Sequence, residues 1–102
     1  MAPIHEIAQY RLKPGLAPER LQQALRPLHA WLVAQPGCLG IQSFLHADGI
    51  AVTDLVGWGS EAEAHRAMAA SQHEASLAAL LPLVEPDSFQ CAYGRLVAER
   101  HP

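Results

Sequence analysis

Two carboxylates lie on segments whose residues alternate like those of β-strands. Glu6 falls in the segment 4–12 and Asp54 in the segment 50–58, each on the more apolar side of its segment. If these segments pair as neighbouring strands, the carboxylates can meet in one apolar pocket. Their repulsion would raise the pKa of one of them and create a general acid or base. The alternative is that each pairs with a nearby Arg or His, or that the strand register separates them.

Four larger side chains could hold a flat ligand beside these carboxylates. Trp58 and Tyr93 could form an aromatic wall, because aromatic rings offer a large apolar area for stacking. Tyr10 and Met68 complete the expected substrate-binding surface. The same side chains also fill hydrophobic cores, so plain packing is the competing interpretation.

Two histidines of the second helical region are candidates for proton transfer, because imidazole titrates near neutral pH. His65 precedes Met68 by three residues, at the edge of the inner apolar stripe, and His73 lies further along. The alternative is that both are solvated or core-edge residues, and His29 is expected to be a partly exposed helix residue. None of the six histidines forms an HxxxH or HxH pattern, so we expect no metal site.

The composition restricts the class of protein. The chain has 102 residues, 50% of them hydrophobic and 17% charged, which predicts one domain spanning 1–102 with a packed core. The net charge is −3 and the basic residues are scattered, so nucleic-acid binding is disfavoured. No apolar stretch is long enough to cross a bilayer, and no signal peptide is visible, which predicts a cytoplasmic protein. Cys38 and Cys91 show no CxxC spacing and are expected to be reduced thiols.

Alternation, apolar stripes and turn residues predict the elements that position these side chains. A first helix should begin at Pro18 and end before Pro36, and a second should begin at Ser60 and end before Pro86. Ser60 with Glu63 forms a capping box, and Ser71 with Glu74 offers another, where the second helix could break. Ala47-Asp48-Gly49 is a hairpin signal. The expected strands are 4–12, 39–46, 50–58 and 89–97.

The resulting order, β-α-β-β-α-β, predicts an α+β fold: a ferredoxin-like sandwich with a four-stranded antiparallel sheet. The helices would cover one face of that sheet. The other face would carry apolar residues that are unsuited to water, so a second copy of the chain is the simplest cover. These residues are Ile7, Ala51, Thr53, Leu55, Ala92 and Leu96.

Four segments carry a family resemblance: IHEIAQYRLKPG, RPLHAWL, PGCLG and DLVGWGSEAEAHRAM. Over residues 4–98 the chain resembles the antibiotic biosynthesis monooxygenase-like family of dimeric α+β barrels. The resemblance implies a homodimer with a ligand pocket between sheet and helices. It also implies cofactor-independent oxygenation of a small aromatic or quinone-like substrate, since such enzymes occur in the family together with haem-degrading ones.

The resemblance suggests a role for each candidate residue. Glu6 would take a proton, Trp58 and Tyr93 would hold the ring, and His65 would steer the developing anion, with no bound metal or flavin. Haem degradation is not expected, because the chain has Glu6 and Ala67 near positions where haem-degrading members carry an Asn and a Trp. Trp58 matches a frequent Trp of the family, whose role there is structural or catalytic.

Two other functions stay open at this stage. The first is a non-catalytic, small-ligand-binding or stress-related dimer whose pocket holds an apolar molecule. The second is a proton-transfer enzyme, an isomerase or lyase that uses Glu6 and Asp54.

Overall fold

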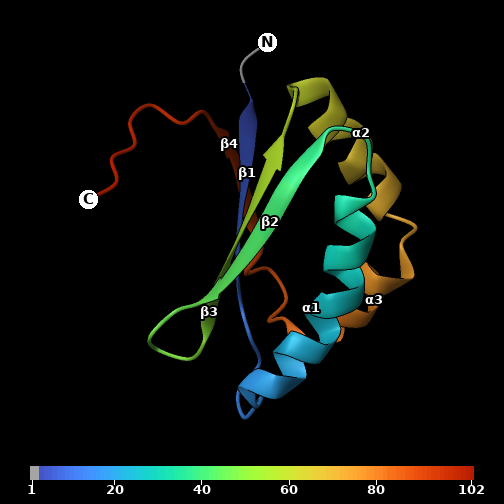
Figure 1. Cartoon of the computed structure of the whole chain (residues 1–102). Coiled ribbons are helices and arrows are strands. Elements are labelled where there is room, and N and C mark those ends of the chain that lie inside the picture. The colour runs from blue at the N-terminus through green and yellow to red at the C-terminus, as the bar shows by residue number, and fades with distance from the viewer. Residues whose placement is uncertain (1–2) are drawn as a thin grey trace.

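The computed structural model describes residues 3–102 and places all the helices on one face of an antiparallel sheet (Figure 1). This confirms the predicted ferredoxin-like α+β fold, with the second helix divided in two. The elements are β1 (Ile4–Arg11), α1 (Pro18–Val33), β2 (Cys38–Leu45), β3 (Ala51–Trp58), α2 (Glu61–Ser71), α3 (Ala75–Leu80), a short 3-10 turn (Leu81–Leu83) and β4 (Gln90–Gly94).

The sheet has the strand order β2-β3-β1-β4, so β1 and β3 are its two central strands. Within the β1–β3 pair, Ala8 lies opposite Asp54 and Glu6 lies opposite Val56. Because side chains alternate between the two faces of a strand, Glu6 and Asp54 both point to the helical side. They are diagonal neighbours across two paired strands, a spacing at which side chains still interact.

The β2–β3 hairpin turns where the sequence predicts it. The Asp48 carboxylate accepts hydrogen bonds from the backbone N–H groups of Ile50 (2.8 Å) and Ala51 (3.0 Å). Gly49 follows with φ of 72°, a left-handed conformation that glycine adopts without a steric penalty. Because β2 and β3 pair through this turn, Ser43 is placed directly opposite Asp54.

The helical region after β3 breaks as predicted, but the second capping box is not formed. The first is present, since the Ser60 hydroxyl accepts the Glu63 backbone N–H at 3.2 Å. At the break, Glu74 is itself the cap and accepts the N–H of Ser76 at 3.2 Å. Ser71 is still the last residue of α2, so its hydroxyl donates back to the Met68 carbonyl at 2.7 Å instead of capping α3.

The last strand is shorter than predicted: β4 ends at Gly94, whereas the sequence suggested a strand reaching Val97. The reason lies in the pairing. In the described part of the chain, β4 is an edge strand that pairs with β1 alone, and Gly94 already pairs with His5, next to the start of β1. Within residues 3–102, the segment 95–102 therefore finds no strand to pair with, and Val97 is 95% exposed. This segment trails away from the sheet on its helix-free side (Figure 1).

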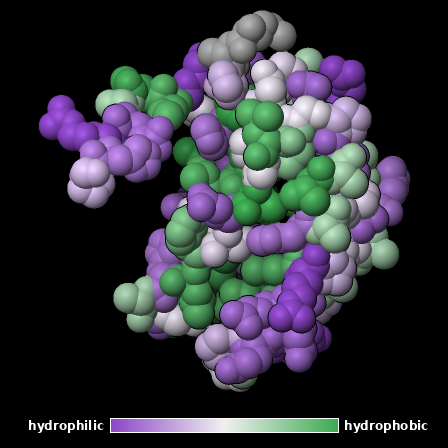
Figure 2. Space-filling view, in the orientation of Figure 1, coloured by the Kyte–Doolittle hydropathy of each residue, from purple (hydrophilic) through white to green (hydrophobic). Residues whose placement is uncertain are grey.

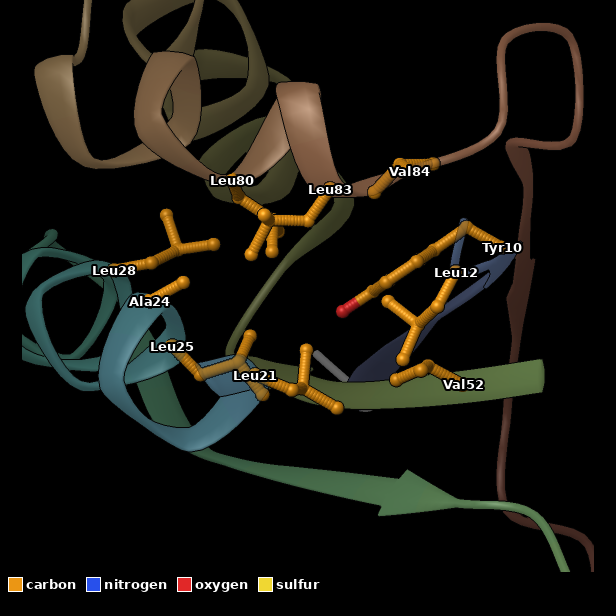
Figure 3. Close-up of a cluster of buried hydrophobic side chains, with 10 residues drawn as sticks. All are labelled: Tyr10, Leu12, Leu21, Ala24, Leu25, Leu28, Val52, Leu80, Leu83 and Val84. Atoms are coloured by element: carbon orange, nitrogen blue, oxygen red, sulfur yellow. The ribbon is translucent and has the colours of Figure 1, made fainter. Parts of the chain in front are cut away.

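Two apolar clusters fill the space between sheet and helices. The larger joins β1 and β3 to α1, α3 and the 3-10 turn (Figure 3). The smaller lies at the other end of the strands, under α2, and contains Ile4, Val56, Trp58, Ala64 and Ala67. Within residues 3–102, no helix is both long and apolar enough to span a membrane.

The face of the sheet without helices carries apolar side chains, as the sequence suggested. Ile7 lies opposite both Leu55 and Ala92, which makes an apolar row across β3, β1 and β4. Phe44 on β2 is 50% exposed. In the orientation of Figure 1, the space-filling view shows apolar side chains gathered where the sheet and the helices face each other, bordered by polar ones (Figure 2).

Replacing Gly37 by alanine is expected to destabilise the fold more than the same change at Gly15. Both glycines have a left-handed φ, of 85° and 81°, so alanine costs about 1 kcal/mol at each. At Gly37 the added methyl group would also overlap the Glu63 carboxylate, which accepts a hydrogen bond from Ser60 at 3.0 Å; at Gly15 it meets nothing within 4 Å.

Disrupting this cap should add about 1 kcal/mol to the cost at Gly37. The measurement is the free energy of unfolding in urea for both variants. Equal losses would show that the overlap with Glu63 relaxes without cost.

Candidate active site

A cavity of about 360 Å³ lies between the sheet and the helices. Its wall is mainly apolar, and Glu6 and Asp54 are its two carboxylates. The remaining wall comes from β1, α1, β2, β3, α2, α3 and the segment before β4, and includes Tyr10, Ile41, Trp58, Met68 and Phe89. A second, larger hollow of about 490 Å³ lies near Arg11 and Glu85 and contains none of the residues that the sequence singled out.

Glu6 is held in the cavity wall by two donors. The indole N–H of Trp58 donates to Glu6 Oε1 at 3.1 Å, and the thiol of Cys91 lies 3.9 Å from Oε2. Burial raises the pKa of the Glu6 carboxyl, the Trp58 hydrogen bond opposes that rise, and the charge of Asp54 adds to it. Glu6 is thus an oriented carboxyl that accepts a proton more readily than an exposed one.

Asp54 is buried, with 7% of its surface exposed. Burial raises the pKa of its carboxyl, while the hydroxyls of Ser43 and Tyr10 and the charge of His29 work in the opposite direction. Its Oδ1 atom has no hydrogen-bond partner within the described part of the chain. A buried oxygen of this kind is costly unless a ligand, a water or a proton satisfies it.

Tyr10 reaches into the cavity from β1, and its hydroxyl points into the space between α1 and α3 (Figure 3). Among residues 3–102 no group hydrogen-bonds this buried hydroxyl in good geometry, although Asp54 is nearby. Burial and the Asp54 carboxyl both raise the pKa of Tyr10, so the phenol stays protonated. The cavity therefore offers a ligand one free hydroxyl and one free carboxylate oxygen.

Two of the remaining predicted residues line the cavity and one lies beside it. Trp58 is fully buried and presents its ring to the cavity, and Met68 faces the same space from α2. Tyr93 lies behind Met68, with its hydroxyl 3.8 Å from the Met68 sulfur, and is not among the lining residues. Burial, followed by the charge of Glu6, raises the pKa of Tyr93 to about 12.

His65 lies outside the cavity. Its side chain is 55% exposed, sits 3.9 Å from the Glu61 carboxylate and contacts the edge of the Tyr93 ring, with the ring centres 5.3 Å apart. Met68, three residues further along α2, lines the cavity, whereas His65 lies beside Tyr93 of β4. The two residues are neighbours on α2, but only Met68 reaches the cavity. His73 follows α2 and is exposed.

Three residues around the cavity were not predicted. Ser43 lies opposite Asp54 on β2, Phe89 stacks on Tyr10 with ring centres 6.2 Å apart, and Cys91 contacts Glu6. Pairing of the second and third strands through the Asp48-Gly49 turn would have identified Ser43. The residues described here, 3–102, contain no group of three or more His, Cys, Asp or Glu side chains arranged to hold a metal ion.

Comparison with known proteins gives matches in structure only. No protein-family model matches the chain, and neither does any curated protein sequence. A Bordetella bronchiseptica protein provisionally named an antibiotic biosynthesis monooxygenase aligns with a TM-score of 0.79 and 17% identity, over 96% of this chain and 100% of its own. The chain has the fold of the antibiotic biosynthesis monooxygenase-like proteins.

Two further antibiotic biosynthesis monooxygenase-like structures align over almost the whole chain. SnoaB from Streptomyces nogalater, a cofactor-independent oxygenase, matches with a TM-score of 0.72 and 16% identity, over 99% of this chain and 97% of its own. The ActVA-Orf6 monooxygenase of Streptomyces coelicolor, in complex with Nanaomycin D, matches with a TM-score of 0.75 and 18% identity, over 99% and 93%. Because the sequence identities are low, these structural alignments establish the shared fold alone.

The difference in unfolding free energy between Asp54→Asn and the parent protein is expected to depend on pH. The folded pKa of Asp54 is raised above its ordinary 3.8, so its contribution to stability is fully present below that pH. This contribution is lost as the pH rises through the folded pKa. The asparagine side chain does not titrate. The unfolding free energy of the variant, relative to that of the parent protein, should therefore increase as the pH rises from about 4 to about 7.

Asp48→Asn provides a control of opposite sign. Backbone hydrogen bonds from Ala51 and Ile50 lower the pKa of Asp48, so its contribution to stability is present at neutral pH and lost on acidification. The unfolding free energy of Asp48→Asn, relative to that of the parent protein, should therefore decrease as the pH rises. Urea unfolding at each pH measures both. Parallel profiles for the Asp54→Asn variant and the parent protein would contradict the raised pKa.

Proposed function

We propose that this protein is a monooxygenase-like enzyme that oxidises a small aromatic or quinone-like substrate without a metal or flavin. The observation that carries the proposal is the pair of carboxylates, Glu6 and Asp54, in the wall of one apolar cavity. The fold shared with SnoaB, a cofactor-independent oxygenase, supports the reaction class by analogy.

The cavity offers the groups that such a reaction needs. A carboxylate of the pair takes a proton from a hydroxyl-bearing ring, and the resulting anion reduces O₂ directly. A ring CH₂ group then becomes a carbonyl: one oxygen atom of O₂ enters the product and the other leaves in water. The free Tyr10 hydroxyl can donate to the oxygen on which negative charge develops. Trp58 and Met68 supply the apolar contact with the ring.

The chain's two tryptophans allow binding to be tested separately from turnover. A hydroxylated tricyclic anthrone is expected to quench the fluorescence of Trp58, which lines the cavity. Trp31→Phe, which keeps Trp58 as the sole indole, should retain the quenching, and Trp58→Phe should lose it. An oxygen electrode then measures turnover of the same anthrone. If no compound in a panel of anthrones and quinols gave either quenching or oxygen uptake, the proposal would be refuted.

The carboxylate pair also supports a second candidate, a proton-transfer isomerase or lyase. The raised pKa values of Glu6 and Asp54 suit a group that both accepts and returns a proton. Exchange of a substrate α-proton with deuterated solvent, in the absence of O₂ uptake, would favour this reaction over oxygenation.

We also propose that the helix-free face of the sheet pairs with a second copy of the chain. Ile7, Leu55 and Ala92 form an apolar row there. Replacing Leu55 by Glu would bury an unpaired charge, a cost of about 3 kcal/mol, and should raise the dimer dissociation constant about 100-fold. Sedimentation velocity over a concentration series measures it.

The control for the dimer is Val33→Glu. Val33 is 53% exposed and lies at the end of α1, on the helical side of the molecule. This variant should sediment like the parent protein. A parent protein that is folded and monomeric at all concentrations would contradict the proposed dimer.

A further inference from the structure

A hydrogen bond between His29 and Ser43 connects the middle of α1 to the wall of the cavity. Nε2 of His29 lies 2.8 Å from the Ser43 hydroxyl oxygen. His29 is half-buried and follows Leu28, one of the residues that line the cavity. One side of this imidazole thus faces the protein interior, while part of the ring contacts solvent.

Ser43 lies between that imidazole and Asp54. It pairs with Asp54 across β2 and β3, on the helical side of the sheet. Directly opposed residues of an antiparallel pair have Cβ atoms about 5 Å apart, which brings the Ser43 side chain next to that of Asp54, and Ser43 lowers the pKa of Asp54. The hydroxyl can accept a hydrogen bond from one side while donating to the other. Three polar groups from α1, β2 and β3 therefore follow one another from the surface to the cavity.

We propose that Asp54, Ser43 and His29 form a relay that carries protons between the carboxylates of the cavity and solvent. A buried base must discard each proton that it accepts, and Asp54 itself is only 7% exposed. Protonated Asp54 passes its proton to the Ser43 oxygen while the Ser43 hydroxyl proton moves to Nε2 of His29. The proton on Nδ1 then leaves to water, which restores a neutral ring and a neutral serine.

The charges around the relay support transfer in this direction. Ser43, Tyr10 and the charge of His29 lower the pKa of Asp54, against the larger effect of burial. The charge of Asp54 in turn raises the pKa of Glu6, the other carboxylate of the cavity wall. A proton on His29 therefore stabilises the ionised Asp54 that is left behind, and a carboxylate ready for the next proton results.

Variants of two histidines distinguish a proton relay from a hydrogen bond that is only structural. His29→Gln can keep a hydrogen bond to Ser43 but cannot carry a proton. Ser43→Ala removes the hydroxyl and Ser43→Thr retains it. His46→Gln is the control, because His46 makes the same kind of contact, 2.7 Å from the Thr53 hydroxyl, on the opposite face of the sheet.

Two measurements are needed, and only the second depends on the proposed oxygenase activity. First, ¹³C NMR of the carboxyl groups follows the titration of Asp54 in each protein. The pKa of Asp54 is expected to rise in His29→Gln and in Ser43→Ala, and to stay unchanged in His46→Gln. Second, oxygen uptake with an anthrone is measured in dilute buffer of a large, poorly penetrating base, with and without added imidazole.

Turnover is expected to fall about tenfold or more in His29→Gln and Ser43→Ala, and to recover in His29→Gln with imidazole. Ser43→Thr, which retains the hydroxyl, should restore most of the activity that Ser43→Ala loses, and His46→Gln, outside the relay, should leave turnover unchanged. Unchanged turnover in His29→Gln would overturn the relay. So would an Asp54 pKa that neither His29→Gln nor Ser43→Ala changes. If the parent protein oxidises no substrate, the proposed function fails, and the NMR titration alone decides the relay.

Discussion

Glu6→Gln is expected to lower the oxygen-consuming turnover about 100- to 10,000-fold, the usual contribution of a positioned general base. Glutamine keeps the size of the side chain and can accept the hydrogen bond from the Trp58 indole, so the geometry of the wall should persist. What is lost is the ability to accept a proton at the cavity surface. The measurement is oxygen uptake at saturating anthrone, together with the melting temperature to confirm folding.

Two further variants sharpen this test. Glu61→Gln changes an exposed carboxylate of α2 outside the cavity and should leave turnover unchanged. Glu6→Gln combined with Asp54→Asn should be little slower than the slower single variant if the two carboxylates act as one unit. A Glu6→Gln protein that turns over at the parent rate would exclude Glu6 as the base.

Trp58→Ala is expected to lower the free energy of unfolding by about 3–5 kcal/mol, the usual cost of removing a buried aromatic side chain. The indole is fully buried, packs in the cluster with Ile4, Val56 and Ala64, and donates its N–H to Glu6. Its removal would enlarge the existing cavity and leave the Glu6 carboxyl without that donor. Such a loss is a large share of the stability of a small domain.

Urea unfolding of three variants measures this effect. Trp31→Ala provides a size-matched comparison, because Trp31 is only partly buried at the rim of the larger cluster and should cost less. Trp58→Phe retains most of the apolar volume and should also cost less, while the pKa of Glu6 should rise because the indole hydrogen bond that lowers it is gone. A loss below about 1 kcal/mol in Trp58→Ala would contradict the packing role.

The elements of this fold follow from local patterns in the chain. The alternation of residues predicted β1 and β3, and the Asp48-Gly49 signal predicted the hairpin. The starts of two helices were predicted from Pro18 and Ser60. The two failures have different causes, one in strand pairing and one in the exact end of a helix. Among residues 3–102, β4 pairs with β1 alone and stops at Gly94 because β1 starts at Ile4. The α3 helix is capped by Glu74 because Ser71 still belongs to α2.

The candidate site was predictable to the extent that strand alternation fixes which way a side chain points. That rule placed Glu6, Tyr10, Asp54 and Trp58 on one face of the sheet, and all four line the cavity. It did not apply to His65, because the orientation of a helical residue depends on how the helix rotates against the sheet. The surfaces available for α2 to pack on decide that rotation.

The sequence by itself determined the order of the elements and the face of the sheet on which its carboxylates lie, because both follow from the geometry of a single strand and its turns. Only the tertiary structure decided that Glu6 accepts a hydrogen bond from Trp58, that one Asp54 oxygen has no partner among residues 3–102, and that His29 of α1 contacts Ser43 of β2. Each of these contacts joins segments whose relative position depends on the packing of the whole core, which no local pattern encodes.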